Sequence, residues 1–490
     1  MTLAVLSEED VRQLLENLSH DEAETLADTL RCALHEYSTG TQLIDAGLIH
    51  QPERTLVHSN ATGATTLFMP SCSPVGHGVK VVSVSSPSAD PSLPTIRPTG
   101  SVSLYGPDGN PIGFLHAQTL TAFRTALGST CLLMKRANVR TLTVFGSGLQ
   151  AYWHIRLALM LRGHTIRSVN IINRRFSDNA RLILKKFYAV PTEAKQREGW
   201  EAARFSVLTP GYGEYSRLQK DHIRDADVIY CCTPSTEDLF DASILTNHEG
   251  RKKGRLIVAV GSYTKNMREL PKELLLQATK VHSGSHFHYH KHALEGGVVI
   301  VDTLDGALKE SGEIVDAGLE ANQLVELGEL VMIDKLTRGE EESLASLPST
   351  EVSSIADSFD KLDIASTGSA MSTVFGSSDS SPSVGRTSNG DSNASHASHD
   401  KRSSSPSPHH RRQSAGFSLP FHHRRTPSQH SNSDKQQRQQ QRDDHLARWL
   451  TSGNVIYKSV GLGLMDLVVG LEVVRLAREK RVGCHIENFS

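Results

Sequence analysis

Residues 141–154 read TLTVFGSGLQAYWH, and this stretch decides the fold class. A five-residue apolar run of β type ends at Phe145 and is followed by Gly146, Gly148 and a helical pattern. In such a strand–turn–helix unit the first glycine permits a tight turn, and the second lets the backbone approach a pyrophosphate. Ala151 keeps helix and strand close, and the helix N-terminus offers free N–H groups. The stretch therefore predicts a dinucleotide-binding turn; the alternative is a glycine-rich turn in an ordinary parallel sheet.

Further apolar runs follow this turn and alternate with helical segments. The expected strands are residues 168–172, 205–208, 227–232, 256–260 and 298–301. Short buried runs in this alternation are typical of a parallel, doubly wound sheet. We therefore predict an α/β protein with a Rossmann NAD(P)-binding domain.

The residues before 120 show a different pattern. Ser7 and Ser19 each precede an acid by three residues, a capping-box spacing that predicts two opening helices. Short β-type runs follow at 56–57, 66–69, 79–84, 101–105 and 112–116, with a hairpin turn at 107–110. They predict an α+β unit, which a helix from 119 to about 137 joins to the dinucleotide turn.

The composition of the 490-residue chain excludes several classes of protein. Its formal net charge is −2, so nothing global indicates binding to nucleic acid or to an anionic membrane. No apolar run approaches the length of a membrane span, the six cysteines lack a zinc-like spacing, and the N-terminus resembles no secretory signal. We therefore expect a cytoplasmic protein without a metal site.

Between about residue 340 and residue 442 the chain is rich in Ser, His, Arg, Gln and Pro. Such a segment buries too little apolar surface to offset its ordering entropy, so we predict a disordered insertion. Order is expected to resume with a strand at 455–457 and a helix at 461–480. The predicted domains are an α+β domain at 1–125 (completed by 450–490), a Rossmann domain at 126–338, the insertion at 339–445, and a C-terminal strand and helix at 446–490 that return to the first domain.

The end of the second expected strand favours one cofactor. In NAD-preferring sites an acid at this place binds the ribose 2′-OH. Here the strand ends in Asn173, Arg174 and Arg175, and no acid occurs before Asp178. Arginine makes planar, charge-assisted bonds to phosphate, so we favour NADP(H), with NAD(H) as the second choice. The alternative is that both arginines are solvated loop residues. Two later strands end at Thr233 and Gly261, where such a cofactor would lie.

Several motifs, in order along the chain, resemble those of the ornithine cyclodeaminase/mu-crystallin family. They are P-x-R at 52–54, GVKVVSV around Lys80, LPT at 93–95, TAFRTA around Arg124, GSGLQAYWH, INRR, ADVIYCCTPS, AVGSYTKNMREL and YKSVGLGLMDL. The resemblance covers residues 2–338 and 454–481. It implies a homodimer of two-domain subunits, in which an α+β domain built from the N-terminal third and the last helix carries the substrate groups and the dimer sheet.

The resemblance also implies site residues. Arg54, Lys80 and Arg124 would converge on the carboxylate of an amino- or imino-acid substrate, and Lys80 and Arg124 would be the catalytic residues. Arg124 would also lie near the cofactor, and Val460 would touch the substrate. The residues that would line the cofactor are Thr95, Leu149, Gln150, Thr233 and Ser459. A cationic cluster of this kind fixes a carboxylate so that the α-carbon faces the nicotinamide. Without the resemblance, each cation would be interpreted as a surface residue.

One departure from the family pattern bears on the reaction. Cyclodeaminases and the related alanine dehydrogenases carry an aspartate in a Gly-x-Asp element, and the matching residues here are Gly261, Ser262 and Tyr263. A tyrosine is not an anionic base near neutral pH unless its pKa is greatly lowered. Mu-crystallin-like ketimine reductases also lack this aspartate. The sequence is therefore closer to that branch.

Three functions remain open at this point. The first is an NADPH-dependent reductase of a cyclic ketimine carboxylate or related imino acid, with Lys80 or a bound water as proton relay. The second is an NAD-dependent ornithine cyclodeaminase or amino-acid dehydrogenase in which another group replaces the missing aspartate. The third is a protein that binds NADPH and a small ligand without turnover.

Three further features have competing interpretations. The histidines at 282, 286, 288, 290 and 292 suggest a metal site, but no Cys or carboxylate joins them, so a polar loop is the preferred interpretation. Hydroxyls after paired arginines at 411–414 and 424–428 fit a basic-directed kinase, or belong to a tolerated insertion. Asp466 interrupts the apolar last helix, where it either orients a substrate group or is a partly exposed acid.

Overall fold

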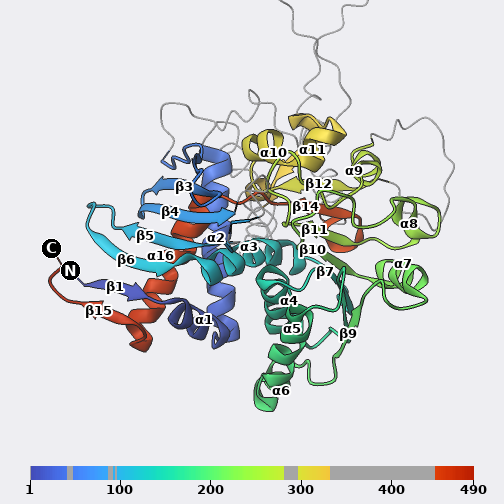
Figure 1. Ribbon diagram of the computed structural model, residues 1–490, viewed down its shortest axis with the longest axis horizontal. Helices are drawn as coiled ribbons and strands as arrows, with labels where there is room; N and C mark the ends of the chain where they lie inside the picture. Colours follow the sequence, from blue (N-terminus) through green and yellow to red (C-terminus); the bar gives the residue numbers. More distant parts are fainter. Residues whose placement is uncertain are drawn as a thin grey trace, which may run out of the picture. The chain divides into compact units, whose positions relative to one another are not determined.

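A computed structural model describes residues 2–40, 48–85, 92–93, 96–280, 296–330, 447 and 449–489. Within these ranges the chain forms two sheets with helices packed against them (Figure 1). One sheet has eight strands and the other has seven. The eight-stranded sheet belongs to a Rossmann-type domain, and the seven-stranded sheet to an α+β part made from both ends of the chain. The predicted fold class is therefore confirmed.

The eight-stranded sheet is parallel throughout. Its strands, in sheet order, are β13 (Leu324–Glu326), β12 (Val298–Val301), β14 (Val455–Lys458), β11 (Leu256–Ala259), β10 (Val228–Cys231), β7 (Thr141–Phe145), β8 (Ser168–Ile172) and β9 (Arg204–Leu208). The order reverses between β7 and β10, which is where doubly wound sheets bind dinucleotides. The predicted strand at 455–457 is present, but it pairs between β11 and β12 in this sheet. The prediction that this strand returns to the first domain is therefore wrong, because its buried apolar residues fill an interior position of the parallel sheet; only the helix and β15 that follow it return.

Helices cover both faces of this sheet, as the alternation of side chains requires. On β7, Val144 belongs to one buried cluster, together with residues of α4 and α5, while Phe145 belongs to a second cluster with residues of α7, α8 and α9. The elements around the sheet are α4 (Leu149–Arg162), α5 (Asp178–Ala189), α6 (Thr192–Glu198), α7 (Tyr215–Asp225), α8 (Ser243–Thr246), η1 (Gly250–Lys252), α9 (Lys272–Ala278), α10 (Leu304–Glu310), α11 (Gly312–Ala317) and η2 (Ala321–Gln323). This is the doubly wound arrangement.

The seven-stranded sheet contains both chain ends. Its strands, in sheet order, are β15 (Cys484–Ile486), β1 (Leu3–Leu6), β6 (Pro111–His116), β5 (Thr99–Tyr105), β4 (Gly76–Ser85), β3 (Ala64–Ser73) and β2 (Thr55–Ser59). Strands β1 and β15 pair antiparallel, so the N- and C-terminal segments lie side by side (Figure 1). The sequence patterns had indicated neither of these two strands. The helices of this part are α1 (Glu8–Glu16), α2 (His20–Gly40), α3 (Ala117–Leu133) and α16 (Gly463–Lys480).

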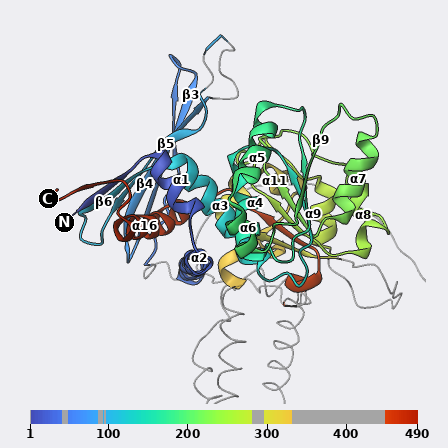
Figure 2. The same ribbon diagram turned by 90° about the horizontal axis from the view of Figure 1, so that it is seen from below.

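Helix α16, formed late in the chain, packs against β3, β4, β5 and β6 and against α2 and α3 (Figure 2). It is buried along most of its first three turns, including Met465 and Asp466. Helix α3 in turn packs against α4 of the Rossmann-type part. The last helix therefore brings its first turn to the place where the two parts of the fold meet.

Local signals in the sequence are confirmed where the structure describes them. Ser7 and Asp10 form a reciprocal capping box at the start of α1, and Ser19 and Glu22 exchange equivalent bonds of 3.1 and 2.8 Å before α2. The turn between β5 and β6 is closed by a bond from Gly106 N to Asn110 O, with Gly109 at a φ of +80°. Side chains that bond their own backbone fix these boundaries.

Several sequence predictions lie outside the described residues. They are the histidine run at 282–292, the whole insertion at 339–445, and the hydroxyls after paired arginines. The division of the chain into domains stays a prediction. Among the helices that the structure describes, none combines the length and the apolar character needed to cross a membrane.

Candidate active site

The dinucleotide-binding turn lies at the carboxyl end of β7. Gly146 has a φ of +104°, and a Cβ there would lie 2.9 Å from Cys232 O, so a side chain would be both strained and crowded. Gly148 directly precedes α4, and no atom lies within 4 Å of the position a Cβ would take. No side chain caps this helix. The first N–H groups of α4 therefore have no side-chain acceptor, as expected for an anion-binding helix start, with Leu149 and Gln150 in the first turn.

The loop after β8 carries the predicted phosphate-binding residues. Asn173 fixes this loop, because its N–H donates to Leu208 O at 3.0 Å and its Nδ2 donates to Arg175 O at 2.9 Å. Arg174 and Arg175 are exposed, and neither has an ion pair with another described residue. Both guanidinium groups are thus free to bind an anionic group at the edge of the sheet.

A buried carboxylate joins the ends of β10 and β11. Glu269 accepts from Thr233 N at 2.6 Å and Thr233 Oγ1 at 2.8 Å with one oxygen, and from Gly261 N at 2.7 Å with the other. Burial raises the pKa of Glu269. A Cβ on Gly261 would lie 2.1 Å from Thr233 O, so only glycine permits this approach. The sequence patterns had not indicated Glu269, whose role depends on two strand ends far apart in the chain.

A second buried carboxylate holds the loop after β14. Asp302, at the end of β12, accepts from Ser459 Oγ at 2.8 Å, Val460 N at 3.1 Å and Gly461 N at 2.6 Å. It is fully buried. The loop that contains the predicted cofactor residue Ser459 and the predicted substrate residue Val460 is therefore anchored by one side chain. Sequence reasoning missed Asp302, although an acid directly after a buried strand at the carboxyl edge was a usable signal.

The predicted substrate cations Lys80 and Arg124 meet at a common carboxylate. Lys80 on β4 donates to Asp466 Oδ2 at 2.6 Å, and Arg124 Nε on α3 donates to Asp466 Oδ1 at 3.1 Å. All three side chains are buried. Burial, together with the charge of Arg124, lowers the pKa of Lys80 to about 8 even though Asp466 opposes the shift. Asp466 therefore orients the two cations, and the alternative of a partly exposed helix acid is wrong.

The third predicted cation, Arg54, lies next to the same loop. Its Nη2 is 3.5 Å from Gly461 O, and it forms an ion pair with Glu310 at the end of α10. The guanidinium of Arg124 also lies against Gly461, since a Cβ there would be 2.8 Å from both Nη atoms. The structure thus brings Arg54 and Arg124 to Gly461, and Lys80 joins Arg124 through Asp466.

The position of the missing aspartate is occupied by a half-buried tyrosine. Burial raises the pKa of Tyr263, so its hydroxyl stays protonated at neutral pH. Its neighbour Ser262 is fully buried and bonded to Glu313 and Lys458. Neither residue provides an anionic base at this place.

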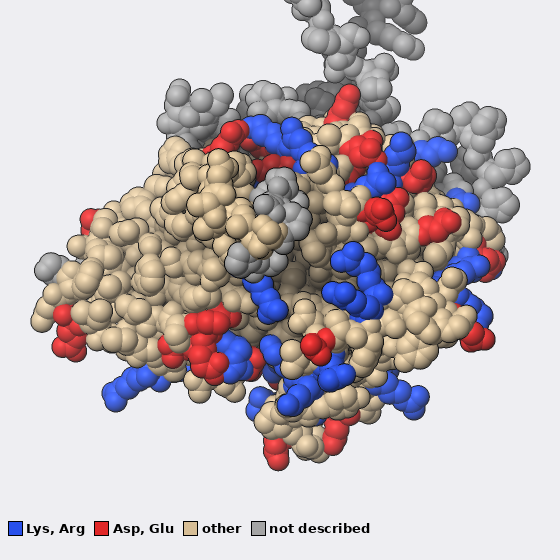
Figure 3. All heavy atoms as spheres, viewed as in Figure 1, with Lys and Arg blue, Asp and Glu red and all other residues tan. Residues whose placement is uncertain are grey.

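The remaining predicted residues are located as follows. Thr95 lies outside the described residues. Gln150 donates to Ala122 O at 3.2 Å and so ties the start of α4 to α3, near Arg124. Lysine and arginine side chains border a hollow near the middle of one face of the molecule (Figure 3).

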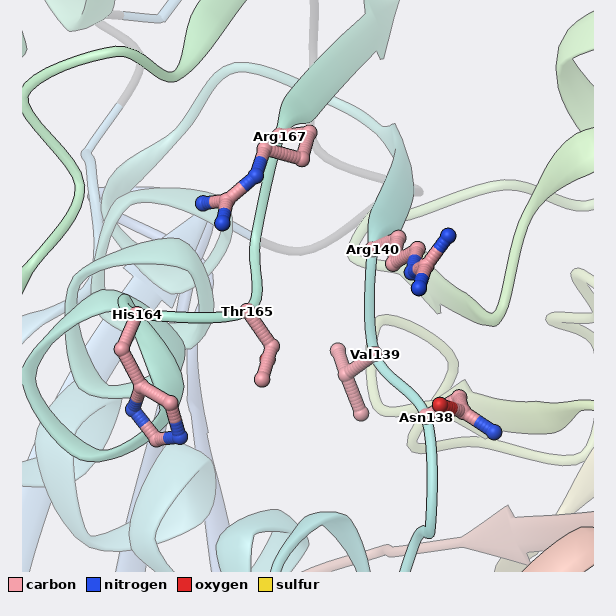
Figure 4. Close-up of a pocket in the computed structure, with 6 residues that line it drawn as sticks. All are labelled: Asn138, Val139, Arg140, His164, Thr165 and Arg167. Atoms are coloured by element: carbon pink, nitrogen blue, oxygen red, sulfur yellow. The ribbon is translucent and has the colours of Figure 1, made fainter.

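A cavity of about 350 Å³ lies elsewhere, before β7 and β8 at the amino edge of the parallel sheet. Its lining residues are Asn138, Val139, Arg140, His164, Thr165 and Arg167. Val139 and Thr165 face each other across it, whereas the guanidinium groups of Arg140 and Arg167 point apart (Figure 4). The charged groups do not converge, so this cavity is separate from the candidate active site.

Comparison with known proteins agrees with this architecture. Residues 7–209 match the ornithine cyclodeaminase/mu-crystallin family. An uncharacterized protein of Saccharomyces cerevisiae is 26% identical over 67% of this chain and 86% of its own length. The ketimine reductase mu-crystallin of Mus musculus is 28% identical over 67% of this chain and 86% of its own length. The resemblance predicted from the sequence is confirmed.

Solved structures show the same fold at low sequence identity. The Δ1-pyrroline-2-carboxylate reductase of Thermococcus litoralis, solved with NADH and L-proline, is 15% identical, has a TM-score of 0.55 and covers 99% of this chain and 100% of its own. An archaeal alanine dehydrogenase dimer with bound NAD is 17% identical, with a TM-score of 0.54 and full coverage of both chains.

Proposed function

We propose that this relative of the ornithine cyclodeaminase/mu-crystallin family is an NADPH-dependent reductase of a cyclic ketimine carboxylate. The observation that carries the proposal is the cluster of the buried Lys80 and Arg124 with the partly buried Arg54, in which both arginines lie at Gly461, at the carboxyl edge of the dinucleotide-binding sheet. Three cations suit a carboxylate-bearing substrate. The absence of an anionic base at Tyr263 favours a substrate that already carries the C=N bond.

The residues of the chain have defined tasks in this proposal. A bound NADPH supplies the hydride that reduces the imine carbon. The cations hold the substrate carboxylate and thereby orient the C=N bond toward the hydride donor, so that binding energy is used to position the reacting atoms. Lys80 is the proton relay, because its lowered pKa allows it to give a proton, near neutral pH, to the ring nitrogen that becomes an amine on reduction. The names of the relatives support this reaction type, since the mouse relative is a ketimine reductase.

The test is cofactor oxidation by the purified full-length protein with Δ1-piperideine-2-carboxylate. We expect oxidation of NADPH, with formation of the cyclic amino acid, and a lower rate with NADH. Release of ammonia from ornithine in the presence of NAD would instead favour a cyclodeaminase. Tight binding of NADPH without oxidation of the cofactor by any cyclic ketimine would favour a binding protein.

Replacing Arg174 by alanine is expected to lower the ratio of kcat/KM with NADPH to that with NADH by about ten- to a hundredfold, since a charge-assisted bond to the 2′-phosphate is lost. Steady-state kinetics with both cofactors measures this ratio. The matched control is Arg181→Ala, which removes an exposed arginine from α5 close by. An unchanged ratio in Arg174→Ala and in Arg175→Ala would contradict the role of this loop.

We also propose that the protein is a homodimer formed through the open face of the seven-stranded sheet. Val57, Phe68 and Phe114 are exposed on one face of this sheet, while α16 covers the opposite face. Exposed apolar side chains on one face of a sheet are typical of a protein interface. Light scattering should give twice the 53.6 kDa mass of one chain, and Phe68→Glu with Phe114→Glu should reduce it to a single chain. A monomeric parent protein would contradict the proposal.

A further inference from the structure

Glu310 is a carboxylate of the candidate active site to which the proposed reaction gives no role so far. It ends α10 and forms an ion pair with Arg54, which comes from the other part of the fold. Its Oε2 is shielded from solvent, and Arg54 is the partner it has among the described residues. Burial raises the pKa of Glu310, and the charge of Arg54 opposes this shift. A carboxylate in this setting depends on a single cation.

The other three carboxylates of the site are already satisfied, since Glu269 accepts from Thr233 and Gly261. Asp466 is bound by Lys80 and Arg124, and Asp302 accepts from three donors of the loop 459–461. Tyr263 supplies no negative charge. When a substrate carboxylate pairs with the guanidinium of Arg54, Glu310 therefore loses its ion-pair partner.

Apart from the separate cluster of Glu269, Glu313 and Lys458 at residues 261–262, the charged groups of the site balance without substrate. Arg54, Lys80 and Arg124 are three cations, and Asp302, Asp466 and Glu310 are three carboxylates. Lys309, which pairs with both Glu53 and Asp305, is exposed and lies outside this group. A substrate that is itself neutral overall, with one carboxylate and one protonated imine, keeps this balance. A second carboxylate would add an uncompensated charge beside Glu310.

We infer that Glu310 exchanges Arg54 for the iminium N–H of the substrate and thereby selects cyclic imino acids with a single carboxylate over dicarboxylates. This inference rests on the reductase function proposed above. Glu310 then has the task of the aspartate that Tyr263 replaces, although it comes from α10. The ion pair between Arg54 and Glu310 is thus replaced by two: Arg54 with the substrate carboxylate, and Glu310 with the iminium.

The experiment compares two substrates that differ by one carboxylate: Δ1-piperideine-2-carboxylate and tetrahydrodipicolinate. The parent protein is expected to prefer the monocarboxylate, and Glu310→Gln is expected to reduce this preference by about ten- to a hundredfold in the ratio of the two kcat/KM values. Glu310→Asp, which keeps the charge, should restore part of the preference. The matched control Glu53→Gln removes an exposed carboxylate next to Arg54 and should leave the ratio unchanged.

The inference is overturned if Glu310→Gln leaves the ratio unchanged, or if Glu53→Gln changes it equally. Failure of the proposed function gives a different result, since neither substrate would then be reduced by the parent protein. In that case calorimetry with the NADP⁺-loaded chain compares pipecolate with piperidine-2,6-dicarboxylate. A preference for pipecolate that Glu310→Gln abolishes would uphold charge selection by Glu310, and equal binding of both compounds would overturn it.

Discussion

Replacing Lys80 by alanine is expected to lower kcat/KM for Δ1-piperideine-2-carboxylate about a thousandfold, because a proton relay and a charge-assisted substrate contact are lost together. The substitution also leaves Asp466 with Arg124 as its remaining ionic partner. Thermal unfolding should therefore accompany the kinetics, so that a loss of folded protein is separated from a loss of chemistry. The matched control is Lys252→Ala, which removes an exposed lysine from η1. Retention of more than a tenth of the parent activity by a folded Lys80→Ala protein would exclude Lys80 from the reaction.

The pKa of Lys80 gives this expectation a pH dependence. Burial lowers that pKa to about 8, so the protonated form that gives up the proton predominates below about pH 8 and is lost above it. We expect kcat/KM to fall with rising pH above this point. In Lys80→Arg the guanidinium stays protonated, so the variant should lack this alkaline decline whatever its absolute rate. If kcat/KM declines at the same pH in both proteins, the decline belongs to a titrating group other than Lys80.

Removal of the Asp302 carboxylate is expected to cause the second large effect. Asp302→Ala leaves the N–H groups of Val460 and Gly461 and the hydroxyl of Ser459 without their buried acceptor. Each such group costs about 1–3 kcal/mol, so we expect the free energy of unfolding to fall by about 3 kcal/mol or more. Urea unfolding measures this change.

The loop 459–461 should also lose its position in Asp302→Ala, with higher KM values for both cofactor and imine. Asp305→Ala serves as the matched control, since that carboxylate lies exposed on α10. Asp302→Asn keeps the size of the side chain and one acceptor oxygen, so its effect should be intermediate. If Asp302→Ala and Asp305→Ala unfold at the same urea concentration, Asp302 does not anchor this loop.

Much of the fold could be predicted from the sequence because the signals are local. The glycines at 146 and 148 sit between an apolar run and a helical pattern, and the capping acids lie three residues after their serines. Such patterns depend on neighbours in the chain. By contrast, β1 and β15 are only four and three residues long, and their pairing joins opposite ends of the chain. Strands of that length carry too little periodicity to be recognised.

The candidate site could be predicted only in part, for a similar reason. The cations Arg54, Lys80 and Arg124 were indicated by motifs of a known family, and Asp466 by its unusual place in an apolar helix. Glu269 and Glu310 carry no such mark, since single acids in loops and at helix ends are common on protein surfaces, whereas Asp302 directly follows a buried strand and could have been recognised. Their burial depends on which strand ends meet across the sheet, and this is a property of the folded chain.

The position of β14 bears on how the protein is made. This strand is interior to the parallel sheet, between β11 and β12, yet it is synthesised near the end of the chain. The seven-stranded sheet is also incomplete until the C-terminal segment, which supplies β15 and α16, has been synthesised. On the ribosome, β11 and β12 therefore present unpaired edges until the last part of the chain emerges, and such edges promote association between chains. A message that ends before codon 455 should yield an aggregating product, because the eight-stranded sheet then lacks its interior strand β14 and the seven-stranded sheet lacks β15 and α16.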